Sequence, residues 1–270
     1  MSRWPIPPRL VDGRASEVGD VWRVLAKSVA GSSHRRIQAE CQDSCFTHRM
    51  SVGEDECLIL ACADGAGSAS EGGLGAAIAC RQFCLRARDA LSGDLRIADL
   101  SAPELLGWYG AVRDDLTEEA SRRGIRPREL ACTLLTAVLS PDAGVFAQVG
   151  DGVIVVGADE SYRAVTWPTS GEYANETTFL TADAFEHAFE CVRWQSPAHE
   201  VALLTDGLQR LALSYADRSV HAPFFIPMFR ALRAAELPDL LAPELERFLD
   251  SPAVNQRTDD DKTLVLAMWA

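Results

Sequence analysis

The chain has 270 residues, of which 47% are hydrophobic and 24% are charged, a balance typical of a globular protein. Its 26 basic and 39 acidic residues give a net charge of −13, which disfavours binding to nucleic acid or an anionic membrane surface because both would repel it. No apolar stretch approaches the roughly 20 residues that span a bilayer. Pro5, Pro7 and Pro8 interrupt the place where a secretory signal would have its apolar core. We therefore expect a cytoplasmic protein with neither a nucleic-acid nor a membrane partner.

The eight cysteines lie mostly within apolar segments of a chain too large to need disulfides for its stability. We interpret them as reduced, buried thiols. Two pairs, Cys41/Cys45 and Cys80/Cys84, have their members four residues apart. Zinc sites usually use two-residue gaps and add a further Cys or His pair, so the spacing disfavours a structural zinc ion.

In the first half of the chain, an N-terminal arm (1–20) precedes a strand over 21–29. The continuous apolar run 57–63 is typical of a strand that is covered on both faces. Apolar residues at helical spacing then predict a helix that begins near Leu74. A second helix is expected over 103–123, with Pro103 at its start and Gly124 just beyond its end.

The second half begins with short β-branched strands over 133–139, 145–149 and 153–156. The gaps between them are hairpin-sized, which predicts antiparallel pairing between successive strands. A turn-rich region (167–181), a strand (201–204), helices within 208–250 and a final strand (263–268) follow. Strands and helices come in blocks rather than in regular alternation, so we predict an α+β layered single domain over 21–270.

Aspartates border three of the apolar strands: Asp64 follows 58–63, Asp206 follows 201–205, and Asp260 and Asp261 precede 263–268. Turn chemistry explains any one Asp-Gly pair, but layered folds bring strand ends together at one rim. Carboxylates gathered there raise one another's pKa unless cations neutralise them. Mg²⁺ and Mn²⁺ accept such oxygen ligands, and a pair of them can activate water against a phosphoryl group. The pattern indicates a metal-dependent hydrolase.

Six motifs, each weak alone, occur in an order and spacing that resemble the metal-dependent type 2C (PPM) protein serine/threonine phosphatases. The resemblance covers about residues 20–268, and Gly171–Thr177 is similar to a bacterial subgroup. It implies a four-layer α-β-β-α sandwich, with two antiparallel sheets inside and helices outside. The motifs are Gln42-Asp43-Ser44, Ala63-Asp64-Gly65-Ala66-Gly67-Ser68, Ala131-Cys132-Thr133, Gly150-Asp151-Gly152, Thr205-Asp206-Gly207 and Asp260-Asp261-Lys262-Thr263.

The same resemblance implies two Mn²⁺ or Mg²⁺ ions per chain. Asp64 would bridge both ions, the Gly65 carbonyl would bind the second, and Asp206 and Asp260 would complete the shell of the first. Asp43 would act through metal-bound water. Asp260 is chosen over its neighbours because Thr263 sets the register of the family's Asp-Asn-x-Thr pattern, which leaves Asp261 in place of the usual Asn. The implied catalytic residues are Asp43, Asp64, Asp206 and Asp260.

The sequence departs from the family pattern at two places. Gln38 stands where the family usually has its phosphate-binding Arg, so His34, Arg35 and Arg36 are the candidates for that role, beside the simpler reading of a solvated loop. Arg128 stands where bacterial members place an acid for a third metal ion, with Glu129 one residue away. Glu129 is therefore the candidate for a third site.

The leading functional hypothesis is hydrolysis of phosphoserine or phosphothreonine by a water or hydroxide that bridges two metal ions, without a covalent enzyme intermediate. The resemblance implies a phosphoprotein substrate of a Hanks-type kinase, in bacterial signalling, recognised by segments 158–200 and 208–250. The alternative is a phosphatase-like pseudoenzyme that binds a phosphoprotein or a kinase, although every core Asp is present. An aspartyl phosphotransferase lacks its Asp-x-Asp pattern here, and a P-loop enzyme lacks its glycine-rich motif.

Overall fold

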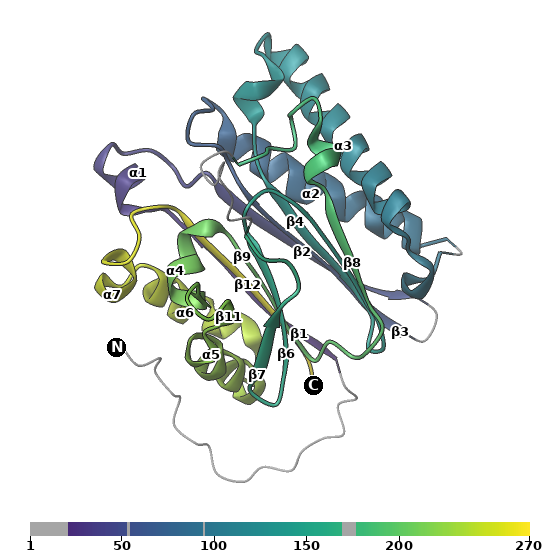
Figure 1. Ribbon diagram of the computed structural model, residues 1–270, viewed down its shortest axis with the longest axis vertical. Coiled ribbons are helices and arrows are strands. Elements are labelled where there is room, and N and C mark those ends of the chain that lie inside the picture. Colours follow the sequence, from purple (N-terminus) through teal and green to yellow (C-terminus); the bar gives the residue numbers. More distant parts are fainter. Residues whose placement is uncertain (1–20, 53–54, 94, 169–176) are drawn as a thin grey trace.

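The computed structural model describes residues 21–52, 55–93, 95–168 and 177–270. The expected arm over 1–20 and most of the subgroup motif over 171–177 lie outside these residues. Two five-stranded antiparallel sheets form the centre of the molecule (Figure 1). In spatial order, the first sheet consists of β1 (Trp22–Val29), β12 (Lys262–Trp269), β9 (Glu200–Leu204), β6 (Val153–Ala158) and β7 (Ser161–Ala164). The second consists of β2 (Asp43–Val52), β3 (Asp55–Asp64), β4 (Leu134–Leu139), β5 (Gly144–Val149) and β8 (Glu190–Trp194).

Helices cover the outer face of each sheet. The second sheet is covered by α2 (Gly72–Leu91) and α3 (Ala102–Arg123), and the first by α5 (Ala222–Ala234) and α6 (Ala242–Leu249) (Figure 1). The predicted four-layer α+β sandwich is therefore confirmed. Within the described ranges, no helix is both long enough and apolar enough to cross a membrane. The short elements are α1 (Ser32–Arg36), α4 (Gln209–Ala212), α7 (Pro252–Asn255), β10 (Leu213–Ser214), β11 (Ser219–Val220) and 3-10 turns at Ile97–Asp99, Pro127–Leu130, Phe185–Ala188, Asp206–Leu208 and Pro238–Leu241.

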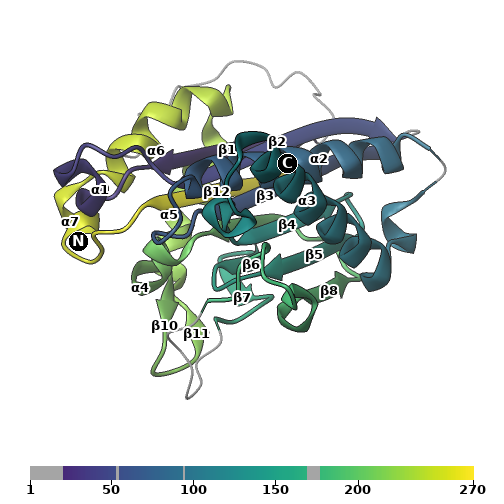
Figure 2. The ribbon, with the colours of Figure 1, turned by 90° about the horizontal axis from the view of Figure 1, so that it is seen from above.

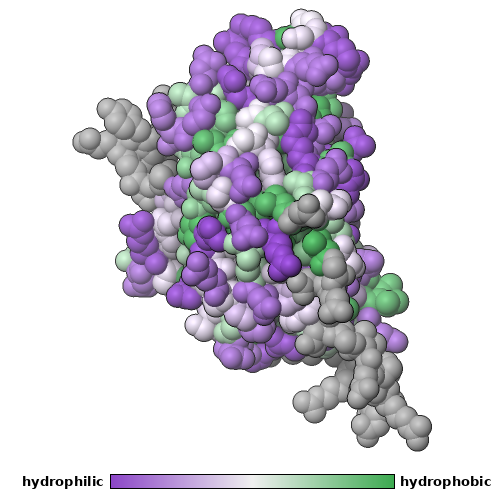
Figure 3. All heavy atoms as spheres, turned by 90° about the vertical axis from the view of Figure 1, so that its right-hand side faces the viewer, coloured by the Kyte–Doolittle hydropathy of each residue, from purple (hydrophilic) through white to green (hydrophobic). Residues whose placement is uncertain are grey.

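Apolar side chains fill three spaces between the four layers. The space between the sheets includes the fully buried Leu60 and Ile154, one from each sheet. Phe83 of α2 and Phe225 of α5 are buried in the two outer spaces, between helices and sheet. The outer surface on the side of α3 shows mainly hydrophilic side chains (Figure 3). All eight cysteines are free thiols; five are buried as expected, whereas Cys41, Cys45 and Cys191 are partly exposed.

The predicted helix over 103–123 is confirmed, and its ends have clear local causes. The Ser101 hydroxyl accepts a hydrogen bond from the Glu104 backbone N–H, and the Glu104 carboxylate accepts one from the Ser101 backbone, which forms a capping box. Gly124 ends the helix with a left-handed φ of 69°, a conformation that favours glycine.

The predicted hairpin between strands 145–149 and 153–156 is wrong. β5 belongs to the second sheet, whereas β6 pairs with β7 and β9 in the first. The connecting Gly150-Asp151-Gly152 instead carries the chain from one sheet to the other, and Gly150 has a φ of 121°. Its length suits a hairpin, but packing between distant strands decides which partner each strand takes. The crossing places Asp151 at the rim where the sheets meet.

We predict opposite effects of an added methyl group on two helices. A Cβ on Gly75 of α2 would lie 2.1 Å from the carbonyl oxygen of Leu130, whereas a Cβ on Gly107 of α3 meets no atom within 4 Å. Gly75→Ala should therefore lower the free energy of unfolding by about 1–3 kcal/mol. Gly107→Ala should raise it by about 0.5–1 kcal/mol, because alanine restricts the unfolded chain more. Thermal and urea denaturation measure both, and equal effects would contradict the predicted close contact at Gly75.

Candidate active site

Four of the predicted site aspartates come to one rim of the sandwich, two from each sheet. Asp43 begins β2 and Asp64 ends β3, and they face each other in the antiparallel register. Asp206 follows β9, and Asp260 comes just before β12. Because β9 and β12 pair directly, the end of one lies beside the start of the other.

A hydrogen bond joins the two sheets at this rim. The Thr205 hydroxyl donates to Asp43 Oδ2 at 2.7 Å and accepts from the Thr263 backbone N–H at 3.0 Å. Asp43 is only 7% exposed, so the hydrogen bond between its carboxyl group and Thr205 is shielded from water. Thr205 thus fixes Asp43 relative to β9 and β12.

The backbone around Asp64 is held from both sides. Its N–H donates to the Thr133 hydroxyl at 2.9 Å, and its carbonyl accepts from the Thr133 N–H at 2.8 Å. The Gly65 N–H donates to the Gln42 carbonyl at 3.1 Å. The hydrogen bonds found among the described residues include none to the Gly65 carbonyl oxygen, which leaves that oxygen available as a ligand.

The clustered carboxyl groups resist ionisation. Burial raises the pKa of Asp43 to about 7, although hydrogen bonds from Thr205 and Thr263 oppose the shift. Burial, followed by the charges of Asp151 and Asp260, raises the pKa of Asp206 to about 7. Burial and then the neighbouring carboxylates raise the pKa of Asp64 well above its usual range. This pattern is expected where several carboxylates share a small, poorly solvated space.

These residues fit hard divalent cations in their donor chemistry. Asp43 Oδ1 and Asp206 Oδ1 are buried without a hydrogen-bond partner, and cations would offset the repulsion among the carboxylates. However, the part of the chain that the structure describes contains no group of three or more His, Cys, Asp or Glu side chains already arranged around a metal position. Binding therefore requires the side chains to turn toward a common point.

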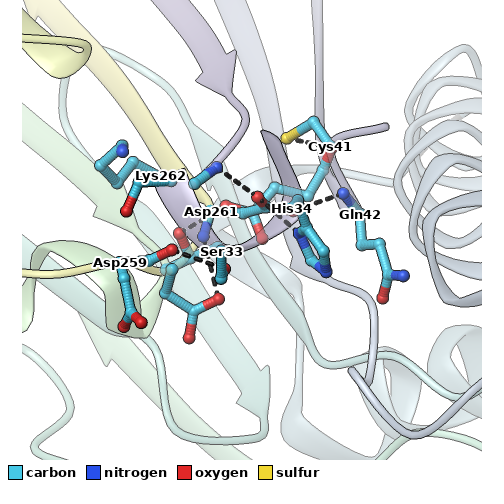
Figure 4. A network of polar contacts seen from close by, with 12 residues as sticks. Ser33, His34, Cys41, Gln42, Asp259, Asp261 and Lys262 are labelled. Carbon is cyan, nitrogen blue, oxygen red and sulfur yellow. Dashed lines mark hydrogen bonds and ion pairs between the residues drawn. The ribbon is translucent and has the colours of Figure 1, made fainter. Parts of the chain in front are cut away.

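Asp261 lies in a network of polar contacts with His34 and Gln42 (Figure 4), an environment different from that of Asp260. Asp261 is 2% exposed, and its carboxylate accepts from the Gly31 N–H at 2.6 Å and the Gln42 N–H at 2.5 Å. His34 Nδ1 forms a hydrogen bond with the same carboxylate at 2.8 Å. Asp260 instead lines a cleft of about 740 Å³. The structure therefore places Asp261 in a structural network and leaves Asp260 facing the cleft.

The three candidate phosphate-binding residues are each held by a carboxylate. His34 pairs with Asp261, Arg35 with Asp250, and Arg36 with Asp259 at 3.3 Å. None of the three lines the cleft. The basic side chains that do line it, which the sequence reasoning missed, are Arg210 and Arg257.

The sequence made Glu129 a candidate metal ligand and gave Asp151 no role. In the structure it is Asp151 whose charge acts on an aspartate of the rim. Glu129 pairs with Arg126 at 2.9 Å and accepts from the Ser70 hydroxyl at 3.2 Å; chiefly the Arg126 hydrogen bond lowers its pKa. Asp151, which the sequence placed in a family motif without a role of its own, carries the charge that raises the pKa of Asp206 most after burial, and it accepts from the Thr177 hydroxyl at 2.6 Å. The Gly-Asp-Gly motif was the signal for it.

We predict that metal-free protein loses stability as pH rises from about 4 to about 7. The pKa of Asp43 and Asp206 rises from 3.8 to about 7 on folding, so the stability that their protonated forms contribute is lost as they ionise. At pH 8 in chelator, the free energy of unfolding of Asp206→Asn should exceed that of the wild type by about 1–3 kcal/mol. This is less than the whole pKa shift would give, because Asp206 is partly exposed and water screens its charge. Urea denaturation at pH 5 and 8 measures this, with the exposed Asp239→Asn as control. A rise in wild-type stability over this range would contradict it.

Comparisons with known proteins agree with this geometry. The family model of protein phosphatase 2C matches residues 30–250. Serine/threonine-protein phosphatase 3 of Escherichia coli (strain K12) is 40% identical over 253 residues, which cover 92% of this chain and 99% of that protein.

Solved structures show the same fold at low sequence identity. A bacterial serine phosphatase matches with a TM-score of 0.62 at 15% identity, over 93% of this chain and 98% of that chain. PppA of Pseudomonas aeruginosa matches with a TM-score of 0.59 at 14% identity, over 92% and 98%. Stp1 of Staphylococcus aureus matches with a TM-score of 0.57 at 17% identity, over 96% and 99%. The family model and the 40% identical relative each cover most of the chain, and the chain therefore belongs to the protein phosphatase 2C family.

Proposed function

We propose that the protein is a metal-dependent serine/threonine protein phosphatase. The observation that carries this proposal is the meeting of Asp43, Asp64, Asp206 and Asp260 at one rim, where their raised pKa values call for cationic partners. The name and the near full-length match of the Escherichia coli relative support the substrate class.

Asp64, Asp206, Asp260 and the Gly65 carbonyl would hold two Mn²⁺ or Mg²⁺ ions, and Asp43 would support them from the buried side. When bound, such ions supply positive charge to the phosphoryl oxygens and make water more acidic. The donor set of carboxylates and a carbonyl supports a hard cation over a softer metal. We do not extend the proposal to a third ion at Glu129, whose carboxylate is paired with Arg126.

The protein contributes pre-arranged positions for these groups. Thr205 holds Asp43 from the first sheet, and Thr133 holds the Asp64 backbone from β4's start. Asp261 joins the Gly31 and Gln42 backbones, which flank the loop before β2. Each tie limits the movement of a carboxylate, so less order has to be gained when the phosphorylated side chain binds.

The structure gives no particular support to the pseudoenzyme alternative, since the described residues retain all four aspartates at the rim. The eight free cysteines favour a reducing compartment, which supports a cytoplasmic location. Substrates phosphorylated by a Hanks-type kinase, in bacterial signalling, complete the proposal. They follow from the family resemblance alone.

We predict that Asp206→Asn lowers kcat/KM on p-nitrophenyl phosphate and on a phosphothreonine peptide by at least about 100-fold, because one anionic ligand is lost. Chelation of the wild type should abolish turnover, and added Mn²⁺ should restore it. Activity that survives both treatments would refute the proposal. Asp239→Asn, in an exposed turn, serves as the control for an unspecific charge change.

We predict that two adjacent aspartates respond differently to the same substitution. Asp260→Asn should weaken Mn²⁺ binding by about tenfold or more with little change in metal-free stability, because its side chain faces the cleft. Asp261→Asn should lower metal-free stability by about 1–3 kcal/mol, since an amide can no longer accept from both Gly31 and Gln42. Calorimetry with Mn²⁺ and denaturation in chelator separate the two effects. The reverse result would mean that the register is shifted by one residue.

A further inference from the structure

Two cavities lie side by side near the metal-binding rim. The catalytic cleft, of about 740 Å³, is bordered by Asp206 and Asp260. A second cavity of about 510 Å³, the apolar pocket, lies beside it. Both are lined by Arg210, Gln256 and Arg257, which therefore form a shared wall. The pocket is thus a continuation of the cleft rather than a separate recess.

The apolar pocket is built by α4, the β10–β11 hairpin, the start of α5, and α7, which group together in Figure 1. The hairpin projects from the molecule beside α4 (Figure 2). Phe224 and Met228, which are 7% and 1% exposed, contribute apolar surface. Leu211 and Ala253 are half-buried and complete the lining. An apolar recess of this size suits a large aliphatic or aromatic side chain.

The two arginines of the shared wall are exposed and carry charge that no carboxylate neutralises. Within the described ranges, neither Arg210 nor Arg257 has a carboxylate within ion-pair distance. By contrast, Arg35 and Arg36 are both paired with aspartates. The cleft itself is also lined by Asp206, Asp259 and Asp260, but the described residues that line the apolar pocket include no carboxylate. The two cations therefore form a local attractive site for an anionic group where the wall meets the pocket.

We propose that the cleft, the shared wall and the apolar pocket form one binding groove for a phosphorylated peptide segment. The phosphorylated Ser or Thr lies in the cleft, an acidic side chain binds Arg210 and Arg257, and a bulky apolar side chain enters the pocket. This inference rests on the proposed phosphatase function and adds its substrate preference. The wall lies between the two cavities, so the stretch of peptide that joins the phosphorylated residue to the apolar residue must pass over it. We therefore assign the acidic side chain of the peptide to the wall.

Arginine suits this contact because its planar guanidinium makes paired hydrogen bonds to a carboxylate. The pocket adds affinity because an apolar side chain that enters it is removed from water. A single phosphorylated residue offers too little surface for the enzyme to select among proteins. Three adjoining subsites would instead recognise the phosphorylated residue, an acidic side chain and an apolar side chain of the same peptide.

The test is steady-state kinetics of the full chain with Mn²⁺ on a positional phosphoserine and phosphothreonine peptide library, with p-nitrophenyl phosphate as a substrate that has no peptide. Wild type should prefer peptides with one acidic and one bulky apolar residue near the phosphorylated position. In Arg210→Ala and Arg257→Ala, the preference for the acid should fall at least about tenfold, as should the ratio of kcat/KM for peptide to that for p-nitrophenyl phosphate. Ala253→Trp, which fills the pocket, should remove the preference for the apolar residue.

Arg247→Ala is the matched control, because Arg247 is an exposed arginine of α6 that lines neither cavity. Its preferences should match those of the wild type. The proposal is overturned if wild type shows no such preference, or if the variants retain it. It is also overturned if the arginine variants lose kcat/KM equally on both substrates, which would show that they bind the phosphoryl group itself. An inactive wild type would instead refute the phosphatase function.

Discussion

A single buried carboxylate, that of Asp261, holds together the loops from which the rim is built. It accepts from Gly31 before α1 and from Gln42 before β2, and it pairs with His34. Removing a charged group from water is costly, and these hydrogen bonds offset that cost only when all are present. The position of Asp43, one residue beyond Gln42, therefore depends on a residue that comes more than 200 positions later.

Opposing demands meet at the same rim. Catalysis by divalent ions needs several carboxylates close together, but their repulsion destabilises the metal-free fold. The hydrogen bond that the Thr205 hydroxyl donates to Asp43 from the opposite sheet favours the ionised carboxylate and so opposes part of the effect of burial. Bound cations would relieve the repulsion that remains among the carboxylates. Metal binding would therefore also stabilise the fold.

The four-layer sandwich and the role of Asp43 followed from the family resemblance. Hydrophobic periodicity and strand-end acids are local signals, and they allowed the α+β class and the strand-end Asp64, Asp206 and Asp260 to be predicted. The helix over 103–123 was predictable for the same reason, from Pro103 and Gly124. The crossing between β5 and β6 was not, because sheet membership depends on contacts between distant strands. For the same reason the ion pair between Arg35 and Asp250, which lie far apart in the sequence, could not be predicted. Nor could the presence of Arg210 and Arg257 at the cleft.

The place of β12 in the first sheet has a consequence for biosynthesis. β12 is the last strand in chain order, yet it lies between β1 and β9. Until residues 262–269 have left the ribosome, β1 has no partner within its sheet and both neighbouring edges stay open to other chains. The nascent protein also lacks Asp260 and Asp261 up to that moment. The enzyme therefore cannot act before residues 260–269 have been synthesised, and the two strand edges stay open until then.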